Sequence, residues 1–154
     1  MKFQLNKFMI CLLIPLSVGA AAGLISSPST EGINMPPLSP PAIVFPLMWI
    51  LLYTLMGISS YLLLGCDASY EDKKHALTLY GTQLAVNFFW PILFFNFRLY
   101  FLSFLWILLL WGLVFLTVVR FSRLCRPAGI ILTPYPLWVT FAAYLNLATF
   151  LLNR

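Results

Sequence analysis

Carboxamide and indole side chains recur at helical spacing in three apolar stretches of this sequence. Residues three, four or seven positions apart share one face of a helix, so each stripe presents its polar and aromatic groups together. The three stripes are Gln83, Asn87 and Trp90; Trp49, Tyr53 and Gly57; and Tyr135, Trp138, Ala142 and Asn146. Because an unpaired amide in an apolar environment costs free energy, the face that carries Gln83 and Asn87 is expected to point into the interior of a bundle.

These groups can stack on a ligand and exchange hydrogen bonds with it. A helix rises about 1.5 Å per residue, which puts Trp49, Asn87 and Ala142 about 10 to 15 Å from the same end of their helices. Three helices then contribute to one layer, in which the small Ala142 leaves room between larger side chains. An aromatic-walled cavity of this kind suits a flat, largely apolar ligand. The alternative that spacing leaves open is that the amides only bond one helix to another.

Ionisable side chains are missing from the middle of every apolar stretch. Ion pumps and proton-coupled carriers usually need such groups along their path, so the sequence argues against an ion transporter. The sole histidine, His75, follows two lysines and is expected to be a solvated residue at a helix end, not a haem ligand. A Ser-His-Asp triad therefore cannot form within the apolar stretches, and no metal site is expected.

The elements that position the stripes follow from the distribution of charge. Thirteen Lys, Arg, Asp and Glu residues leave five uncharged gaps, at 8–30, 32–66, 75–97, 99–119 and 127–153. Each gap is long enough for a helix of about 20 apolar residues to cross a bilayer core. The gaps lack the period-two alternation of barrel strands, and 62% of the residues are hydrophobic. The sequence predicts a single-domain, all-α membrane protein, a five-transmembrane-helix bundle with spans at about 5–26, 42–64, 75–96, 99–120 and 129–152.

The basic residues near the ends of these spans predict the orientation in the membrane. One side would carry seven of them, namely Lys2, Lys7, Lys73, Lys74, Arg120, Arg123 and Arg126. The other side would carry only Arg98 and Arg154. This bias predicts a cytoplasmic N-terminus and an outer C-terminus. The membrane is separately expected to be a bacterial cell membrane. The net charge of +5 reflects the same bias, and no nucleic-acid partner is expected.

The three cysteines have neither metal-binding nor redox spacing. Cys66 and Cys125 fall on the predicted cytoplasmic side, where thiols stay reduced. Cys11, Cys66 and Cys125 are therefore all expected to be structural residues.

The first span has two further interpretations. Lys2 and Lys7 followed by an apolar run and small residues could form a signal peptide, although the run is long for one. Gly19 and Gly23 form a G-x-x-x-G step, which lets helices approach closely in lipid. This step could serve a contact within the bundle or a homodimer.

Prolines are expected to shape the same region. Pro46, Pro91 and Pro134 lie inside or near the start of three spans, and each removes one helical N–H. A kink at Pro91 would bow the third helix and widen the cavity. The proline-rich run 36–41 is stiff and extended, so it could hold the outer loop across the cavity as a lid.

Three ordered motifs carry a resemblance to a known family. They are PPLSPPAIVFPLMWILLYTLMG at 36–57, Gln83-x-x-x-Asn87-x-x-Trp90 followed by Phe94-Phe95, and PYPLWVTFAAYLN at 134–146. In this order they resemble the second-, third- and fifth-helix signatures of the TspO/MBR family, which comprises tryptophan-rich sensory proteins, translocator proteins and peripheral-type benzodiazepine receptors. The resemblance covers the whole chain.

The resemblance implies a five-helix bundle with an intrabundle pocket for tetrapyrroles, such as protoporphyrin IX and haem, and for benzodiazepine-type ligands. Porphyrin or haem would be a ligand, with no cofactor required. The implied role is stress-linked porphyrin homeostasis, and the implied assembly is a homodimer. Carried over onto this sequence, the pocket residues would be Trp49, Tyr53, Gln83, Asn87, Trp90, Trp138, Phe141, Ala142 and Asn146.

Two other functions remain open alongside binding. One is transport of porphyrins or other small solutes, and the other is light-dependent porphyrin breakdown with Trp49, Trp90 and Trp138 as electron donors. A structural bundle that binds no small molecule is a third possibility.

The sequence departs from the family pattern in the outer loop. Ser29 and Thr30 stand where many relatives have a Trp-Tyr pair, and Leu38 stands where many have Trp. These losses weaken the lid side of the implied pocket and put the light-dependent chemistry in doubt. The spacing of Tyr144 and Arg154 does not match the cholesterol motif, so cholesterol transport is not expected.

Overall fold

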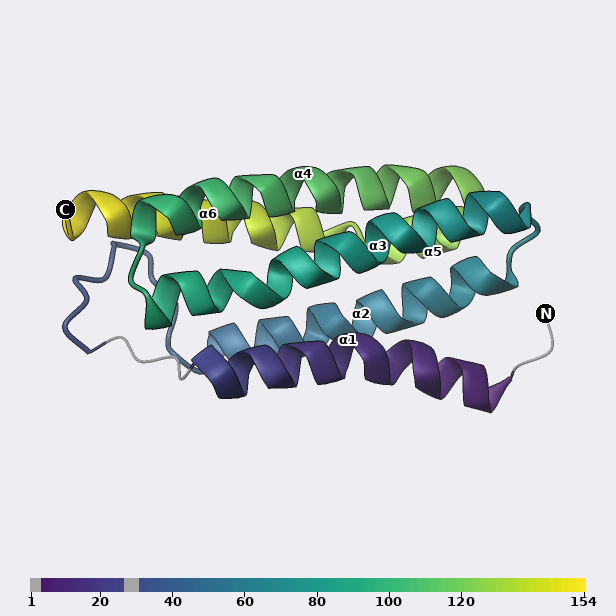
Figure 1. The fold of residues 1–154 in the computed structure, drawn as a ribbon, viewed down its shortest axis with the longest axis horizontal. Coiled ribbons are helices and arrows are strands. Elements are labelled where there is room, and N and C mark those ends of the chain that lie inside the picture. The colour runs from purple at the N-terminus through teal and green to yellow at the C-terminus, as the bar shows by residue number, and fades with distance from the viewer. Residues whose placement is uncertain (1–3, 27–30) are drawn as a thin grey trace.

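Helices account for most of the chain that the computed structural model describes, residues 4–26 and 31–154 (Figure 1). The helices are α1 (Leu5–Ser26), α2 (Val44–Gly65), α3 (Tyr70–Pro91), α4 (Tyr100–Leu124), α5 (Arg126–Ile131) and α6 (Pro134–Leu152), with a π-helical segment, η1 (Ile92–Asn96), after α3. Within these described ranges no strand occurs. The all-α prediction is confirmed.

Within the described part of the chain, four helical stretches are long and apolar enough to cross a membrane. They are Leu5–Ser26, Val44–Gly65, Tyr100–Leu124 and Arg126–Leu152, the last of which comprises α5 and α6. The chain is thus an integral, multi-pass membrane protein. The helix α3 has the length of a span, at 22 residues, but its first turns carry the four charged residues 71–74. Four of the five predicted spans therefore meet both criteria, length and composition.

The start of α3 is stabilised by its own capping residue. The Ser69 hydroxyl accepts a hydrogen bond from the backbone N–H of Asp72 at 3.0 Å. Glu71 and Asp72 place negative charge in the first turn, where the helix dipole favours it. The helix consequently begins at Tyr70, five residues before the predicted start at 75.

The last predicted span, 129–152, is divided in two. The helix α5 ends at Ile131, and α6 begins with Pro134 at its first position. Proline has no backbone N–H to donate and is favoured at the first position of a helix, so it starts α6 where α5 has ended.

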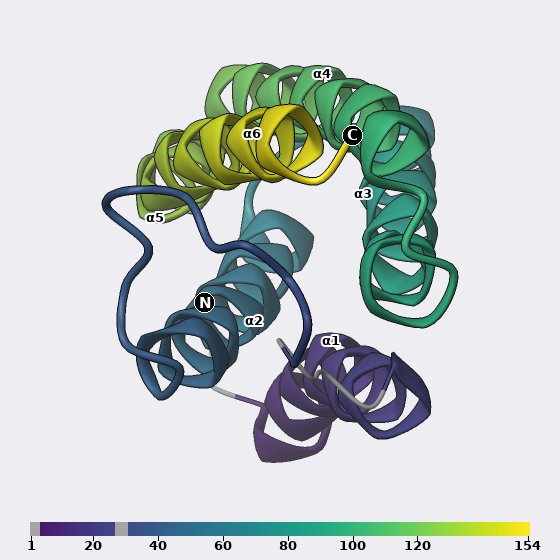
Figure 2. The same cartoon turned by 90° about the vertical axis from the view of Figure 1, so that its left-hand side faces the viewer.

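Two groups of helices face one another across the bundle. The helices α1 and α2 lie along each other, and α4 packs against both α3 and α6 (Figure 2). The backbone of α2 comes close to α3 at few positions, and its C-terminal part contacts α5. Side chains therefore fill most of the space between α2 and the helices α3 and α6.

Glycine allows the close approach of α1 and α2. A Cβ atom on Gly57 would lie 2.7 Å from the Cα of Leu12, so the two backbones touch there. A Cβ atom on Gly19 would overlap the ring of Tyr53. Gly19 therefore makes a contact within the bundle, whereas Gly23 has open space around it. Association of two copies through this step stays a prediction.

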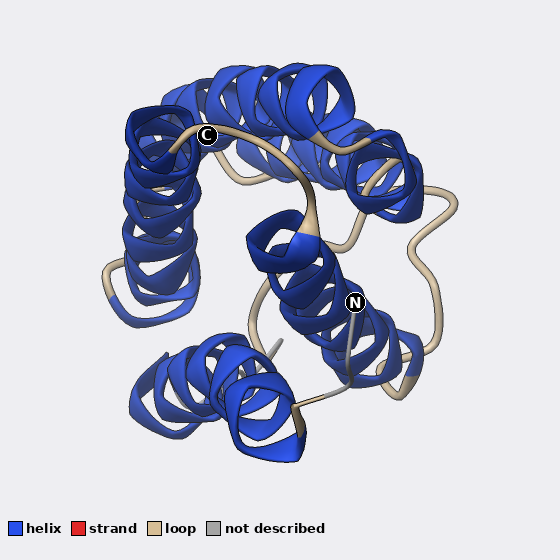
Figure 3. Cartoon of the chain, turned by 90° about the vertical axis from the view of Figure 1, so that its right-hand side faces the viewer, coloured by secondary structure: helices blue, strands red, loops and turns tan. Residues whose placement is uncertain are grey.

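The two ends of the bundle differ in charge as predicted. The starts of α1 and α3 and the ends of α2 and α4 lie at one end, which faces the viewer in Figure 3. This end, called the basic end below, carries the described residues Lys7, Lys73, Lys74, Arg120, Arg123 and Arg126. Lys2 lies outside the described residues. Arg98 and Arg154 lie at the opposite end, and which end faces the cytoplasm stays a prediction.

The loop before α2 crosses the end of the bundle opposite the basic end (Figure 2). The backbone N–H of Asn34 donates to Oδ1 of Asn153 at 2.8 Å, and Nδ2 of Asn153 donates back to the Asn34 carbonyl at 3.0 Å. The Tyr144 hydroxyl donates to the Pro37 carbonyl at 3.1 Å. The loop is thus attached to α6, as a lid would be, and its action as a lid stays a prediction. Leu38 points outward, and the predicted departures at Ser29 and Thr30 lie outside the described residues.

Candidate functional site

The indole of Trp49 lies at the meeting point of three helices. Its ring centroid is 5.8 Å from that of Tyr53 on α2, 6.1 Å from Trp90 on α3 and 6.4 Å from Tyr135 on α6. These separations are typical of attractive aromatic pairs. The four rings, called the Trp49 cluster below, occupy the space between α2 and the facing pair of helices.

Buried amides beside the Trp49 cluster form a hydrogen-bonded chain through one hydroxyl. The Tyr135 hydroxyl donates to Oε1 of Gln83 at 2.8 Å and accepts from Nδ2 of Asn87 at 3.0 Å. Nε2 of Gln83 lies 3.7 Å from the sulfur of Met56 on α2. Gln83, Asn87 and Tyr135 are all buried, so the chain connects α3 to α6 away from water.

A second amide joins the same two helices. The indole N–H of Trp90 donates to Oδ1 of Asn146 at 3.1 Å. Nδ2 of Asn146 donates to the Ala142 carbonyl one turn earlier in α6, at 2.7 Å. The amides thus form hydrogen bonds between helices, which is the alternative to ligand binding that the sequence left open.

The structure brings most of the predicted site residues together. Six are buried and lie in or beside the Trp49 cluster: Tyr53, Gln83, Asn87, Trp90, Ala142 and Asn146. Trp49 is partly buried at its centre. Trp138 and Phe141 pair with each other at 5.6 Å, and Trp138 meets Phe45 at 5.9 Å, so these rings form an adjoining second cluster. Whether the combined set binds a ligand stays a prediction.

Trp138 has a polar group without a partner. Its Nε1 is buried and finds no hydrogen-bond partner among the described residues. A buried donor without a partner costs free energy, which a ligand that supplies an acceptor would recover. Of the nine predicted site residues, Trp138 is therefore the one with a buried donor free to form a hydrogen bond with an acceptor atom of a ligand.

Tyr135 is a central residue that the predicted site set omits. It stands on the same stripe as Trp138 and Asn146, so the helical spacing already placed it on the correct face. Its hydroxyl holds both amides of α3, a role that depends on how α3 and α6 are rotated toward each other. Phe45 and Met56 are likewise contacts that the sequence did not single out.

The two tryptophans of α4 form hydrogen bonds to neighbouring helices. The Trp106 indole donates to the Val86 carbonyl on α3 at 2.8 Å. The Trp111 indole donates to the Thr140 hydroxyl on α6, also at 2.8 Å. Neither indole belongs to the Trp49 cluster, so both are useful controls for experiments on the site.

The chemistry that this site offers is stacking and hydrogen bonding. Its side chains are apolar aromatic rings, indoles, amides and the phenols of Tyr53 and Tyr135, and none carries a charge. Among the described residues, no group of three or more His, Cys, Asp or Glu could hold a metal ion. The arrangement suits recognition of a flat molecule with a few polar atoms.

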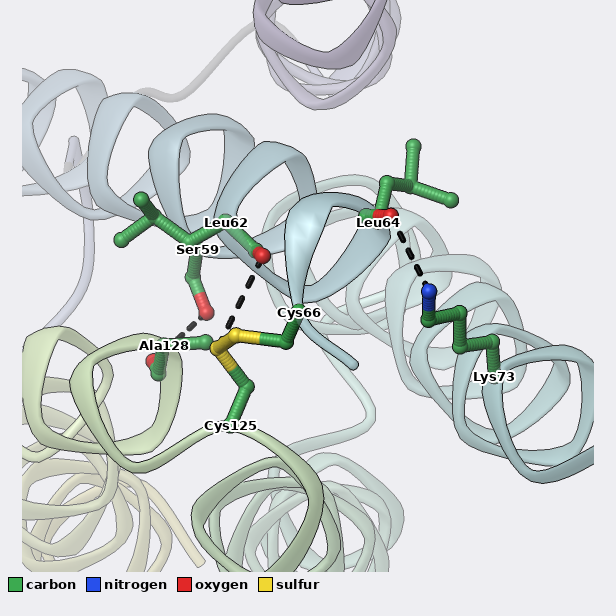
Figure 4. The surroundings of a disulfide bond; sticks show 7 residues. All are labelled: Ser59, Leu62, Leu64, Cys66, Lys73, Cys125 and Ala128. Carbon is green, nitrogen blue, oxygen red and sulfur yellow. Dashed lines mark hydrogen bonds between the residues drawn. A yellow bond between two sulfur atoms is a disulfide. The ribbon is translucent and has the colours of Figure 1, made fainter. Parts of the chain in front are cut away.

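The prediction that Cys66 and Cys125 are reduced thiols is wrong for this structure. The two residues form a disulfide with their Cα atoms 5.8 Å apart, a usual separation for such a bond (Figure 4). Cys66 follows α2 and Cys125 lies between α4 and α5, so the fold brings together residues 59 positions apart. Sequence spacing could not show this contact. Cys11 is free and buried, consistent with a structural residue.

Comparisons with known proteins agree with the motifs. The TspO/MBR family model matches residues 11–152. "Tryptophan-rich protein TspO" of Chlorobaculum tepidum is 30% identical over 99% of this chain and 99% of its own length. "Protein CrtK" of Rhodobacter capsulatus is 33% identical over 91% of this chain and 89% of its own. "Translocator protein" of Ovis aries is 36% identical over 74% of this chain and 68% of its own.

Proposed function

The chain belongs to the TspO/MBR family, and we propose that it binds tetrapyrroles such as protoporphyrin IX or haem between α2, α3 and α6. Benzodiazepine-type ligands are proposed for the same space. The biological role that we propose is porphyrin homeostasis under stress. Transport and light-dependent breakdown of porphyrin stay predictions.

The observation that carries this proposal is the Trp49 cluster. Its rings come from three helices and take the place of direct packing between α2 and the facing helices. A flat macrocycle offers the same kind of apolar face as these rings, so it can replace ring–ring contacts with contacts of its own. The cluster can therefore open for such a ligand without exposing its apolar groups to water.

The polar groups beside the cluster support the same proposal. The amides of Gln83 and Asn87 share one hydroxyl partner, and each retains further donor or acceptor capacity. The indole N–H of Trp138 makes no hydrogen bond to any described residue, so it can donate one to a ligand. A tetrapyrrole has ring nitrogens and carboxylates that can pair with such groups.

The test is a titration of the purified protein, in lipid discs, with protoporphyrin IX, read by the change in porphyrin absorbance. Saturable binding is expected. Trp138→Phe keeps an aromatic ring but removes the free N–H, and it should weaken binding about tenfold, the loss of one well-placed hydrogen bond. The control Trp111→Phe removes an indole N–H from α4, outside the site, and should leave the affinity unchanged. Absence of saturable binding to the unaltered protein would reject the proposal.

A further inference from the structure

The disulfide fastens one end of α2 to the opposite side of the bundle. Cys66 follows directly after α2, and Cys125 forms the link between α4 and α5 (Figure 4). About two turns before the end of α2, the Ser59 hydroxyl donates to the Ala128 carbonyl of α5 at 2.7 Å. The bond and this buried contact together hold the basic end of α2 against α5.

The rest of α2 has few direct attachments to the helices that it faces. It lies along α1 and approaches the α3 backbone at few positions. Trp49 and Tyr53 stand 17 and 13 residues before Cys66, or about 25 and 20 Å along the helix. The helix α2 is therefore a wall of the proposed pocket that is fixed at its base and meets α3 and α6 mainly through side chains.

Fixing the base of a stiff helix limits how the pocket can open. In the disulfide-bonded structure the rings of the Trp49 cluster are in contact with one another. A flat ligand can enter between them only if α2 moves away from α3 and α6. With the disulfide in place, the base of α2 is held covalently and the helix can only pivot about it. After reduction the base is held only by packing and by the Ser59–Ala128 hydrogen bond, which can break reversibly, so the base can move as well.

We propose that the Cys66–Cys125 pair is a redox site that controls ligand binding in this pocket: the disulfide keeps α2 closed, and reduction releases it. This inference rests on the proposed function. The reduced form binds the tetrapyrrole more tightly, because less free energy is spent in moving α2.

The reductant is a dithiol of the thioredoxin class. Its thiolate attacks the sulfur of Cys66, which is partly exposed, and the buried Cys125 leaves as a thiolate that takes up a proton. The second thiol of the reductant then attacks the mixed disulfide and releases Cys66. Two protein thiols and one oxidised dithiol result, so two electrons and two protons reach the protein.

The predicted cytoplasmic location of the basic end explains why the disulfide would form reversibly. The disulfide lies at the basic end, which the distribution of Lys and Arg predicts to be cytoplasmic. Cytoplasmic thiols are kept reduced unless the cell is under oxidative stress. The bond would then form only under oxidising conditions, which makes binding of the tetrapyrrole responsive to them.

The experiment compares the two redox forms of the unaltered protein in lipid discs. Oxidised and phosphine-reduced samples are distinguished after denaturation by a maleimide-polymer gel shift, with one reactive thiol in the first and three in the second. The dissociation constant for protoporphyrin IX should be about fivefold lower in the reduced form. By thermodynamic linkage, saturating protoporphyrin IX should shift the thiol–disulfide equilibrium in a dithiol buffer by the same factor.

Two variants and one measurement in cells complete the test. Cys125→Ser should bind like the reduced protein under all conditions, and Cys11→Ala should keep the full redox difference. Equal affinity of the two forms of the unaltered protein would overturn the redox control and leave the proposed function standing. Failure of both forms to bind would overturn the proposed function and the control with it. A disulfide that stays oxidised in unstressed cells would show a permanent cross-link and overturn the control alone.

Discussion

The indole N–H of Trp90 on α3 donates a hydrogen bond to Oδ1 of Asn146 on α6 at 3.1 Å, and both residues are buried. Asn146 uses its other amide atom to bond the Ala142 carbonyl of its own helix. One amide thus holds two helices together and fixes the ring that faces Trp49. The Trp90–Asn146 pair therefore holds α3 to α6 and also forms part of the wall of the proposed pocket.

Replacing Trp90 by Phe should destabilise the fold more than the same change at Trp111. Trp90→Phe leaves a buried Asn146 oxygen without a donor, which costs about 1–3 kcal/mol. The control Trp111→Phe removes a hydrogen bond to Thr140, whose exposed hydroxyl also bonds the Pro136 carbonyl. Thermal unfolding of both variants in the same detergent measures the difference. Equal losses would show that the Trp90–Asn146 bond adds nothing specific.

Tyr135→Phe should be more damaging than Tyr144→Phe, although both remove one hydroxyl. The Tyr135 hydroxyl pairs with Gln83 and Asn87 in the interior, so its removal breaks two hydrogen bonds and leaves both amides short of a partner. The Tyr144 hydroxyl makes one bond to the Pro37 carbonyl at the exposed end of the bundle. We expect a loss of about 2 kcal/mol at Tyr135 and under about 1 kcal/mol at Tyr144. Thermal unfolding of the two variants decides, and a larger effect at Tyr144 would contradict the assigned network.

The faces of the helices could be predicted from the sequence, but their pairing could not. Spacing placed Gln83, Asn87 and Trp90 on one face because a helix has a fixed period. It did not show that Tyr135 would receive both amides, since that depends on how α3 and α6 are rotated against each other. The Cys66–Cys125 bond needs the positions of α2, α4 and α5 relative to one another, which no local pattern contains.

The boundaries of a span could be predicted where the helix ends at the same residues as the uncharged stretch. The first span, predicted at 5–26, coincides with α1. The third begins earlier than predicted because Ser69 caps a helix whose first turns carry charge, and counting uncharged residues excludes those turns. The fifth is interrupted before Pro134 because proline starts a helix more readily than it continues one.

Gly57→Ala should separate α1 from α2, while Gly81→Ala should be tolerated. The added methyl at Gly57 would lie 2.7 Å from Cα of Leu12 and 2.9 Å from the carbonyl oxygen of Cys11, and backbone cannot yield there as a flexible side chain would. Overpacking of this kind costs about 1–3 kcal/mol. Gly81 on α3 has no neighbour within 4 Å, so Ala there should stabilise the helix by up to about 1 kcal/mol. Unfolding temperatures of the two variants should therefore change in opposite directions, and a tolerated Gly57→Ala would contradict the close contact of α1 and α2.

The orientation of the chain can be decided with two introduced cysteines of matched exposure. Tyr70 is 77% exposed at the basic end, and Leu38 is 79% exposed in the loop at the opposite end. In a background without the three native cysteines, Leu38→Cys should react with a membrane-impermeant maleimide in intact cells. Tyr70→Cys should react only after the membrane is permeabilised, because the basic residues keep that end in the cytoplasm. The reverse labelling pattern would place Cys66 and Cys125 in an oxidising compartment, where their disulfide would be a permanent cross-link.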